Sequence, residues 1–470
     1  MQRREFIKAM GFGAASLIAG GCQSGRAGRT NRSATRPNIV FIMVDDMGWA
    51  DLGCYGSTQI QTPNIDRLAA EGIRFTQAYS GCTVCAPARS VLMTGLHTGH
   101  TPVRGNTGGI ALPADAVTVA SVLKQAGYAT GGFGKWGLGD VGTTGVPEQH
   151  GFDEFFGYYH QVHAHYYWTN YLWHNSESVP LPGDEGSIKR YSHYHIFNRT
   201  MDFIRANQNR PFFCFAPWTP PHGRYEIPEV DPAWRMYKDK PWPQQAKVVA
   251  AMDTMIDRQV GELVTLLKEL GLERHTIVFF CSDNGAAQRF EGVLDSSGPL
   301  RGYKRSMYEG GIRVPLIAWG PGRIAPAGVS DHPCYFADVM PTLAELAGAG
   351  QYVPEDMDGL SIAATLMGTP GRQKKHEFMY WEWAKYNWSK RQNVPSGLAQ
   401  AVRMGKWKAV RHKSDEPFEL YDLSADEGES NNVASEHPRV VEKIEAYIAR
   451  DRREPPPQIE PEKPEGKRYR

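Results

Sequence analysis

Uninterrupted runs of apolar residues, many of them β-branched, recur along the chain. The clearest are residues 38–44, 211–216, 276–281 and 314–319. A strand with one face in water alternates apolar and polar residues, whereas a continuous apolar run is typical of a strand that is covered on both faces. These runs therefore predict the core strands of a parallel sheet with helices on either side.

Segments with helical spacing of apolar residues lie between these runs. They cover residues 62–72, 118–127, 247–271 and 338–348. The alternation of strands and helices predicts an α/β fold, namely a large, mixed, mostly parallel sheet sandwiched by helices, over residues 37–370. In such folds ligands gather at the carboxyl ends of the strands, so the residues that follow each run are the first candidates for a site.

The pattern changes after residue 370. Two segments resemble antiparallel strands and a third resembles an amphipathic helix, at residues 401–410, 418–423 and 438–452. They predict a smaller C-terminal α+β subdomain that carries an antiparallel sheet, over residues 371–453. The proline-rich and charged residues 454–470 are predicted to be disordered.

The first residues carry a targeting pattern. Arg3-Arg4-Glu5-Phe6 resembles the twin-arginine export signal, and the apolar stretch after it is too short for a stable membrane span. Cys22 fits two interpretations, a lipoprotein processing site with lipidation or an incidental cysteine in a cleaved signal. We predict an export signal over residues 1–22, a flexible linker over residues 23–36, and an exported protein that is periplasmic, attached to the cell envelope or extracellular.

Composition narrows the classes of function. The 470 residues include 52 Lys and Arg against 51 Asp and Glu, a net charge of +1, so there is no basic excess to indicate a nucleic-acid partner. The seven cysteines are too few for a disulfide framework. Cys54 and Cys82 are candidates for one pair in an oxidising compartment, which their spacing does not establish.

Oxygen-bearing side chains follow two of the predicted strands. Asp45 and Asp46 end one run, and Asp283 and Asn284 end another. Three carboxylates and one carboxamide suit a hard cation such as Ca²⁺ and disfavour zinc. Either pair alone is more often a helix cap or a turn.

The segment Cys85-Ala86-Pro87-Ala88-Arg89 opens a stretch with helical character. A helix N-terminus presents unpaired backbone N–H groups and the positive end of a dipole. Pro87 suits an early helical position, and Arg89 adds a permanent charge with several donors. A buried cysteine near a turn is the commoner explanation for such a residue on its own. Cys82 is the competing thiol nearby, but no proline and arginine follow it at the same spacing.

Taken together, these pieces resemble the type I, formylglycine-dependent sulfatases of the alkaline phosphatase superfamily, over about residues 37–423. The resemblance implies that a formylglycine-generating maturation enzyme oxidises Cys85, and that the hydrated aldehyde is the nucleophile. It also implies one Ca²⁺ per chain, with the ligands Asp45, Asp46, Cys85, Asp283 and Asn284.

The same resemblance implies groups that bind sulfate. Lys135 lies in the motif Gly134–Gly139, Lys304 follows Gly302-Tyr303, and His222 follows Pro220-Pro221. The implied catalytic residues are Cys85, Arg89, Lys135, His222 and Lys304. The implied or candidate substrate contacts are Lys135, His160, His163, His165, His222 and Lys304. The three histidines from 160 to 165 are candidates because of their residue type, since many family members have at the position of Gly137 a histidine that contacts the formylglycine hydroxyls.

The reaction implied is hydrolysis of a sulfate ester. Aromatic residues are dense over residues 158–173 and again at Trp381, Trp383 and Trp388, and aromatic rings stack on sugar faces, although core packing explains any one of them equally well. The predicted substrate is therefore a sulfated carbohydrate, either a polysaccharide or a glycosaminoglycan fragment. Two alternatives stay open: a phosphoester or phosphonate monoester hydrolase on the same scaffold, and a catalytically weak glycan-binding relative, which Gly137 would suit.

Overall fold

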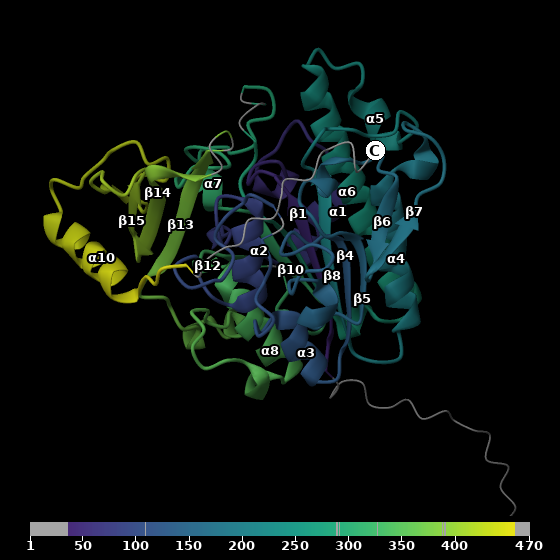
Figure 1. Cartoon of the computed structure of the whole chain (residues 1–470), viewed down its shortest axis with the longest axis horizontal. Helices are drawn as coiled ribbons and strands as arrows, with labels where there is room; N and C mark the ends of the chain where they lie inside the picture. The colour runs from purple at the N-terminus through teal and green to yellow at the C-terminus, as the bar shows by residue number, and fades with distance from the viewer. Residues whose placement is uncertain are drawn as a thin grey trace, which may run out of the picture. The chain divides into compact units, whose positions relative to one another are not determined.

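The main structural element of the protein is a ten-stranded sheet (Figure 1). The computed structural model describes residues 36–455 except 109, 288, 289, 291, 327, 388, 390 and 391. The strand order is β11-β2-β10-β9-β1-β8-β4-β5-β6-β7. The strands are β1 (Asn38–Asp45), β2 (Ile73–Phe75), β4 (Ala129–Lys135), β5 (Glu154–Tyr158), β6 (Tyr171–His174), β7 (Glu177–Pro180), β8 (Phe212–Pro221), β9 (Thr276–Ser282), β10 (Leu316–Trp319) and β11 (Gly328–Ser330). The central strands β9, β1, β8, β4 and β5 pair in parallel, and β10 and β6 join them in antiparallel fashion.

The four predicted core strands are confirmed as β1, β8, β9 and β10, but β10 runs antiparallel to β9, whereas the apolar runs predict parallel strands. Every residue of β1 is buried, as its continuous apolar run requires. The last of the four begins later than predicted, at Leu316, directly after Pro315, which has no N–H to donate to a neighbouring strand. Strand β8 extends beyond the predicted end, to Pro221.

Helices cover both faces of this sheet. The α-helices of the described residues are α1 (Pro63–Glu71), α2 (Cys85–Thr94), α3 (Val119–Gln125), α4 (Ser192–Ala206), α5 (Pro232–Tyr237), α6 (Gln244–Glu269), α7 (Glu309–Ile312), α8 (Val339–Ala347), α9 (Ala363–Leu366) and α10 (Pro438–Asp451), of which α10 lies on the C-terminal sheet. Successive side chains of a strand point to opposite faces. Accordingly, Ile39 and Phe41 of β1 pack into one core with residues of α2, α3 and α8, and Val40 and Ile42 pack into a second core with residues of α1, α4 and α6.

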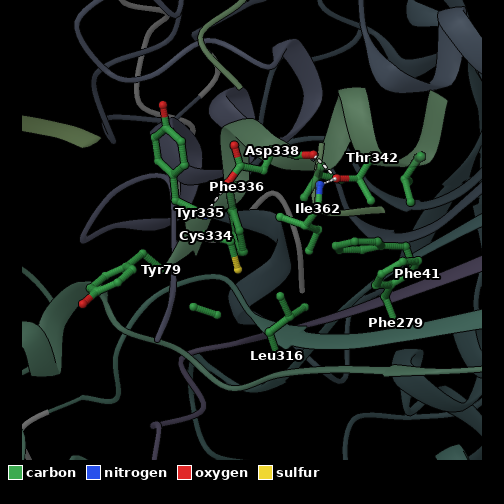
Figure 2. Close-up of a pocket in the computed structure, with 13 residues that line it drawn as sticks. Phe41, Tyr79, Phe279, Leu316, Cys334, Tyr335, Phe336, Asp338, Thr342 and Ile362 are labelled. Atoms are coloured by element: carbon green, nitrogen blue, oxygen red, sulfur yellow. Dashed lines mark hydrogen bonds between the residues drawn. The ribbon is translucent and has the colours of Figure 1, made fainter. Parts of the chain in front are cut away.

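A small apolar void lies where the short strand β12 (Cys334–Tyr335), paired with β3 (Ala78–Tyr79), and helix α8 meet the sheet (Figure 2). Its volume is about 20 Å³, close to that of one water. The polar groups beside it are already paired, since the hydroxyl of Thr342 donates to the carbonyl of Asp338 over 2.6 Å and accepts from the N–H of Ile362 over 2.9 Å. A water there would find few partners, so we assign the void to core packing.

A separate antiparallel sheet follows, with the order β13 (Met379–Asn387), β14 (Gln392–Met404), β15 (Trp407–Arg411) and β16 (Glu419–Asp422) (Figure 1). Ile444 and Ile448 of α10 pack on this sheet. The prediction of one strand over residues 401–410 is wrong at its middle, because Gly405 adopts a φ of 60° and turns the chain between β14 and β15. The fold is otherwise as predicted, a helix-covered, mostly parallel sheet with a smaller antiparallel sheet after it.

The predicted export signal, Cys22 and the residues of the C-terminal tail after 455 lie outside the described residues. Within the described part of the chain, no helix combines the length and the apolar character that crossing a membrane requires.

Buried ion pairs join the C-terminal sheet to the main domain. The Nζ atom of Lys408, on β15, lies 2.9 Å from Oε1 of Glu309 on α7 and 3.2 Å from Oε1 of Glu429, and all three side chains have no exposed surface. Burial raises the pKa of Glu429 to about 7, against the lowering effect of Lys408. Lys408 thus compensates two carboxylates that water cannot reach.

Replacing Lys408 with methionine is expected to lower the free energy of unfolding by about 3–5 kcal/mol, because two buried carboxylates lose their shared cation. Urea denaturation followed by circular dichroism measures the change. Lys406→Met is the matched control, since Lys406 pairs with Asp422 at the surface, and it should cost less than about 0.5 kcal/mol. Equal effects of the two substitutions would contradict this role of Lys408.

Candidate active site

Cys85 is the first residue of α2 and is almost fully buried. Its Sγ atom lies 3.3 Å from Oδ1 of Asp45 and 3.2 Å from Nζ of Lys304. The next residue, Ala86, donates its backbone N–H to Oδ1 of Asn106 over 3.1 Å. Burial, with the charges of Asp283 and Asp45, raises the pKa of the Cys85 thiol to about 12. The motif cysteine therefore stands at a helix N-terminus among charged groups, as an un-ionised thiol.

The two acidic pairs predicted from the sequence lie beside each other. They follow the neighbouring parallel strands β1 and β9, in which Val44 pairs with Ser282. The backbone N–H of Asp46 donates to Oδ1 of Asp283 over 3.3 Å, and Nδ2 of Asn284 donates to Oδ1 of Asp46 over 2.7 Å. All of these side chains are buried. The sheet thus gathers the oxygens at the carboxyl ends of adjacent strands.

Three buried cations face these carboxylates. The Nη2 atom of Arg89 lies 2.8 Å from Oδ2 of Asp283, and Nζ of Lys135 lies 2.5 Å from Oδ2 of Asp45. Lys304 forms an ion pair with Asp46. Lys135 is the last residue of β4, a strand that was not among those predicted from the apolar runs.

These charges set the protonation of the two central acids. Burial tends to raise the pKa of Asp45, but nearby His222, Lys135 and Arg89 hold it well below its usual range. Burial and the neighbouring Asp45 raise the pKa of Asp283 to about 6. The two acids therefore differ, with Asp45 the more firmly ionised of the pair.

The donor set fits a hard cation. Ligand atoms of Asp45, Asp46, Cys85 and His222 lie within 4.8 Å of one another. The Oδ1 atom of Asn284 is buried and has no hydrogen-bond partner among the described residues. A buried carbonyl oxygen without a partner costs about 1–3 kcal/mol, and a calcium ion bound by carboxylate and amide oxygens would satisfy it.

A cavity of about 730 Å³ opens over this cluster. Its walls include Asp46, His222 and Lys304 from the cluster, and His165 from the aromatic stretch. The Nε2 atom of His222 lies 3.6 Å from Oδ2 of Asp46, and the rings of His165 and His222 are 4.6 Å apart. The volume is in the range of small-ligand sites. Asp46, His222 and Lys304 line the cavity, and Cys85 lies behind Lys304, with Sγ 3.2 Å from its Nζ.

The structure separates the three histidine candidates. His165 lines the cavity. His163 has no exposed surface, and its Nε2 lies 2.8 Å from Oγ1 of Thr169 and 3.1 Å from the carbonyl of Tyr171, so it supports the surrounding loop. His160 is also buried, and its Nδ1 accepts the N–H of Val162 over 3.0 Å. Neither His160 nor His163 lines the cavity, because both rings are enclosed by the chain around them.

The space beside Gly137 is occupied by another side chain, which sequence reasoning missed. Gly137 has a φ of 80°, and a Cβ atom there would lie 3.2 Å from Cγ of Gln161 and 3.6 Å from Cδ of Arg89. The Nε2 atom of Gln161 donates to Oδ1 of Asn106 over 3.0 Å. Gln161 therefore stands where a side chain at position 137 would reach, and only contacts between distant segments reveal it.

The suggested pairing of Cys54 with Cys82 is wrong, because both are free thiols. Cys82 is buried in the turn before α2, and its Sγ lies 3.5 Å from the carbonyl oxygen of Glu382. It thus faces β13 of the C-terminal sheet, whereas Cys85 faces the acidic cluster.

The chain is similar to known sulfatases over most of its length. Residues 37–349 match the family model Sulfatase, and residues 302–454 match the model N-sulphoglucosamine sulphohydrolase, C-terminal. Arylsulfatase A of Bos taurus is 33% identical over 458 residues, which cover 85% of this chain and 84% of the relative. The N-acetylgalactosamine-6-O-sulfatase of Bacteroides thetaiotaomicron is 29% identical, over 91% of this chain and 95% of the relative. The crystal structure of Ps i-CgsB in complex with k-i-k-neocarrahexaose has a TM-score of 0.77 at 27% identity, covering 90% of this chain and 94% of that one.

Proposed function

The chain belongs to the sulfatase family of the alkaline phosphatase superfamily and is a sulfuric ester hydrolase, and on this premise we propose that it removes sulfate groups from a sulfated polysaccharide or glycosaminoglycan fragment. The observation that carries the proposal is the meeting of Cys85, two acidic pairs and three cations beside one cavity, which Asp46 and Lys304 of this set line. Such cations stabilise negative charge on the oxygens of a transferring group.

We infer that residue 85 acts as formylglycine. When hydrated, this group supplies one hydroxyl that attacks sulfur and a second whose proton loss restores the aldehyde and releases sulfate. Asp283 or its neighbour Asp45, 3.3 Å from Sγ of Cys85, would accept a proton from those hydroxyls, and Lys304, 3.2 Å from Sγ, would orient them by donating a hydrogen bond. A serine or cysteine at this position has no such internal route for releasing its sulfated form, which is the chemical reason for the modification.

The remaining residues divide between binding sulfate and assisting the leaving group. Lys135, Arg89 and Lys304 present cations to the sulfuryl oxygens. His222 and Lys304 both line the cavity and are the two candidates for giving a proton to the departing sugar oxygen. Burial holds the pKa of His222 well below its usual range. Burial also tends to lower the pKa of Lys304, but the charges of the nearby carboxylates together outweigh it and raise that pKa, so Lys304 is the group that carries a proton to give. His165 is the proposed sugar contact beside it.

We propose Ca²⁺ as the metal, with Asp45, Asp46, Asp283 and Asn284 and residue 85 as its ligands. The ion would neutralise charge on the bound sulfate. The support is the closeness of the ligand atoms of Asp45, Asp46 and residue 85, the second acidic pair on the neighbouring strand, and the unpaired Oδ1 of Asn284.

The sugar assignment is the finer part of the proposal. It is supported by relatives named N-acetylgalactosamine-6-sulfatase or N-acetylgalactosamine-6-O-sulfatase and by a similar structure that was solved in complex with k-i-k-neocarrahexaose.

We also propose that the boundary between the catalytic domain and the C-terminal subdomain lies at residue 370. The protein is exported to the periplasm or cell envelope and is matured by a formylglycine-generating enzyme. A lipid anchor at Cys22 is one outcome of its N-terminal processing.

One experiment tests the chemistry directly. Peptide mass spectrometry of the exported protein should show the mass of formylglycine at residue 85, and the same spectra report the mature N-terminus. In parallel, the protein should release sulfate from 4-nitrophenyl sulfate and from sulfated sugars faster than it releases phosphate from 4-nitrophenyl phosphate. Preference for the phosphate would favour the phosphoester hydrolase instead. Sugar binding without any sulfate release would favour the weak glycan-binding relative.

A further inference from the structure

A second cavity, of about 460 Å³, lies close to the segment that carries Cys85. Its lining comes from residues 104–107 and 110, from described residues of the β13–β14 hairpin, from Ser414 and from residues 452, 454 and 455. Asn106, in this lining, accepts the N–H of Ala86. Glu382, also in the lining, contacts Sγ of Cys82 through its carbonyl oxygen. Residues 82–86 therefore lie directly behind the lining of the second cavity.

The same segment lies behind the lining of the first cavity. The backbone N–H of Arg305, which lines the first cavity, donates to the carbonyl of Thr83 over 3.0 Å. Lining residues of both cavities thus contact residues 82–86, so the two cavities approach each other at this segment. An oligosaccharide whose sulfated residue occupies the first cavity would extend from there toward the second.

The lining of the second cavity suits a sugar ring. Trp383 and Tyr386 contribute aromatic rings, and amide or hydroxyl groups come from Asn106, Asn393, Ser396 and Ser414. Aromatic faces with a few polar groups around them are a common way to hold a ring that has one apolar face and hydroxyls at its edge. Trp381 differs, since it has no exposed surface and donates its Nε1–H to the carbonyl of Ser80 over 2.8 Å.

The charges in this lining cancel. Arg104 lies 3.1 Å from Oε1 of Glu382, and Arg452 lies 2.6 Å from Oε2 of the same carboxylate and 2.5 Å from Oε1 of Glu454. Two cations thus meet two carboxylates. The first cavity, by contrast, has Arg301, Lys304 and Arg305 in its walls. The difference assigns the sulfated residue to the first cavity and an uncharged residue to the second.

We propose that the second cavity is a subsite for an unsulfated sugar residue next to the sulfated one, with Trp383 as the stacking platform. The inference rests on the proposed function, because it takes sulfate release at Cys85 as its starting point. It makes the preferred substrate an oligosaccharide and not a sulfated monosaccharide.

The test compares monosulfated tetrasaccharides with the matching sulfated monosaccharides, in a galactose and an N-acetylgalactosamine series, with 4-nitrophenyl sulfate as the reference. For the series that is turned over, kcat/KM of the tetrasaccharide should exceed that of the monosaccharide by about tenfold, and Trp383→Ala should remove most of this advantage. Val394→Trp adds a large side chain at the exposed rim of the cavity. It should also remove most of the tetrasaccharide advantage, and it leaves no cavity in the hydrophobic core. Val329→Trp, at an exposed position on β11, and Trp407→Ala, on β15 outside this lining, are the matched controls and should keep the advantage.

An equal kcat/KM for tetrasaccharide and monosaccharide in the unaltered protein would overturn the subsite, and so would a tetrasaccharide advantage that survives both Trp383→Ala and Val394→Trp. If no sulfated sugar is turned over, the proposed sugar substrate is rejected, and this result does not yet decide whether the second cavity binds a sugar. Titration of the unsulfated tetrasaccharides against Cys85→Ala, followed by tryptophan fluorescence, then decides the subsite. Binding that Trp383→Ala weakens supports it, and no binding, or binding that Trp383→Ala leaves unchanged, rejects it.

Discussion

Cys85→Ser should lose at least about a thousandfold in kcat/KM on 4-nitrophenyl sulfate, and Cys85→Ala should be equally inactive. The reason is chemical, since a serine at this position can accept the sulfuryl group but has no second hydroxyl to expel it. The thiol is packed 3.2 Å from Lys304 and 3.3 Å from Asp45, so the serine variant keeps the volume and the neighbours of the native side chain. Mass spectrometry must verify that the serine is unmodified.

Cys82→Ser provides the matched control. This second thiol lies three positions earlier in the same turn and is as buried as Cys85, but it contacts the carbonyl of Glu382 and not the acidic cluster. It should therefore retain sulfatase activity. Multiple turnover by an unmodified Cys85→Ser protein would refute the proposed nucleophile, and a single burst of product with no further turnover would support it.

Removal of divalent cations should have the second largest effect. Dialysis against a chelator is expected to lower kcat on 4-nitrophenyl sulfate by at least about a hundredfold, and Ca²⁺ should restore it. The ion would also stabilise the native state, because three buried carboxylates and the unpaired Oδ1 of Asn284 otherwise face one another. The midpoint of thermal unfolding should thus rise with added Ca²⁺.

The Asp46→Asn substitution separates a specific site from a general effect of calcium. This variant should lose both activity and the dependence of the unfolding midpoint on Ca²⁺. Asp51→Asn is the control, because Asp51 is a buried carboxylate a few residues further on that accepts the N–H of Gly48 and is not part of the cluster. It should keep the dependence on Ca²⁺. An unfolding midpoint that Ca²⁺ does not change in the unaltered protein would contradict a resident calcium ion.

The two cavities differ in their linings, which in this proposal bind different parts of the substrate. The first, beside the acidic cluster, is lined by basic residues, and the second is lined by aromatic and neutral polar residues and by charged residues that pair with one another. Because the second is built partly from β13 and β14, the C-terminal sheet contributes to the choice of substrate in this proposal. The buried Lys408, which joins that sheet to α7, would then hold the substrate-binding wall in place.

The sequence by itself determined the features that depend on local pattern. Continuous apolar runs are a property of strands buried on both faces, so the core strands could be read from them. Parallel strands end at a common edge of the sheet, so Asp45-Asp46 and Asp283-Asn284 could both be expected at that edge, but only the tertiary structure made β1 and β9 neighbours. The spacing of Cys85, Pro87 and Arg89 similarly placed the cysteine at a helix start, where α2 begins.

Only the tertiary structure decided questions that depend on contacts between distant segments. It placed His165 at the cavity and enclosed His163, although both belong to the same short histidine-rich stretch. It buried Trp381 and left Trp383 to line a cavity, although they are two positions apart on one strand. The physical reason is that exposure is set by what other segments pack against a side chain, and neither residue type nor spacing along the chain contains that information.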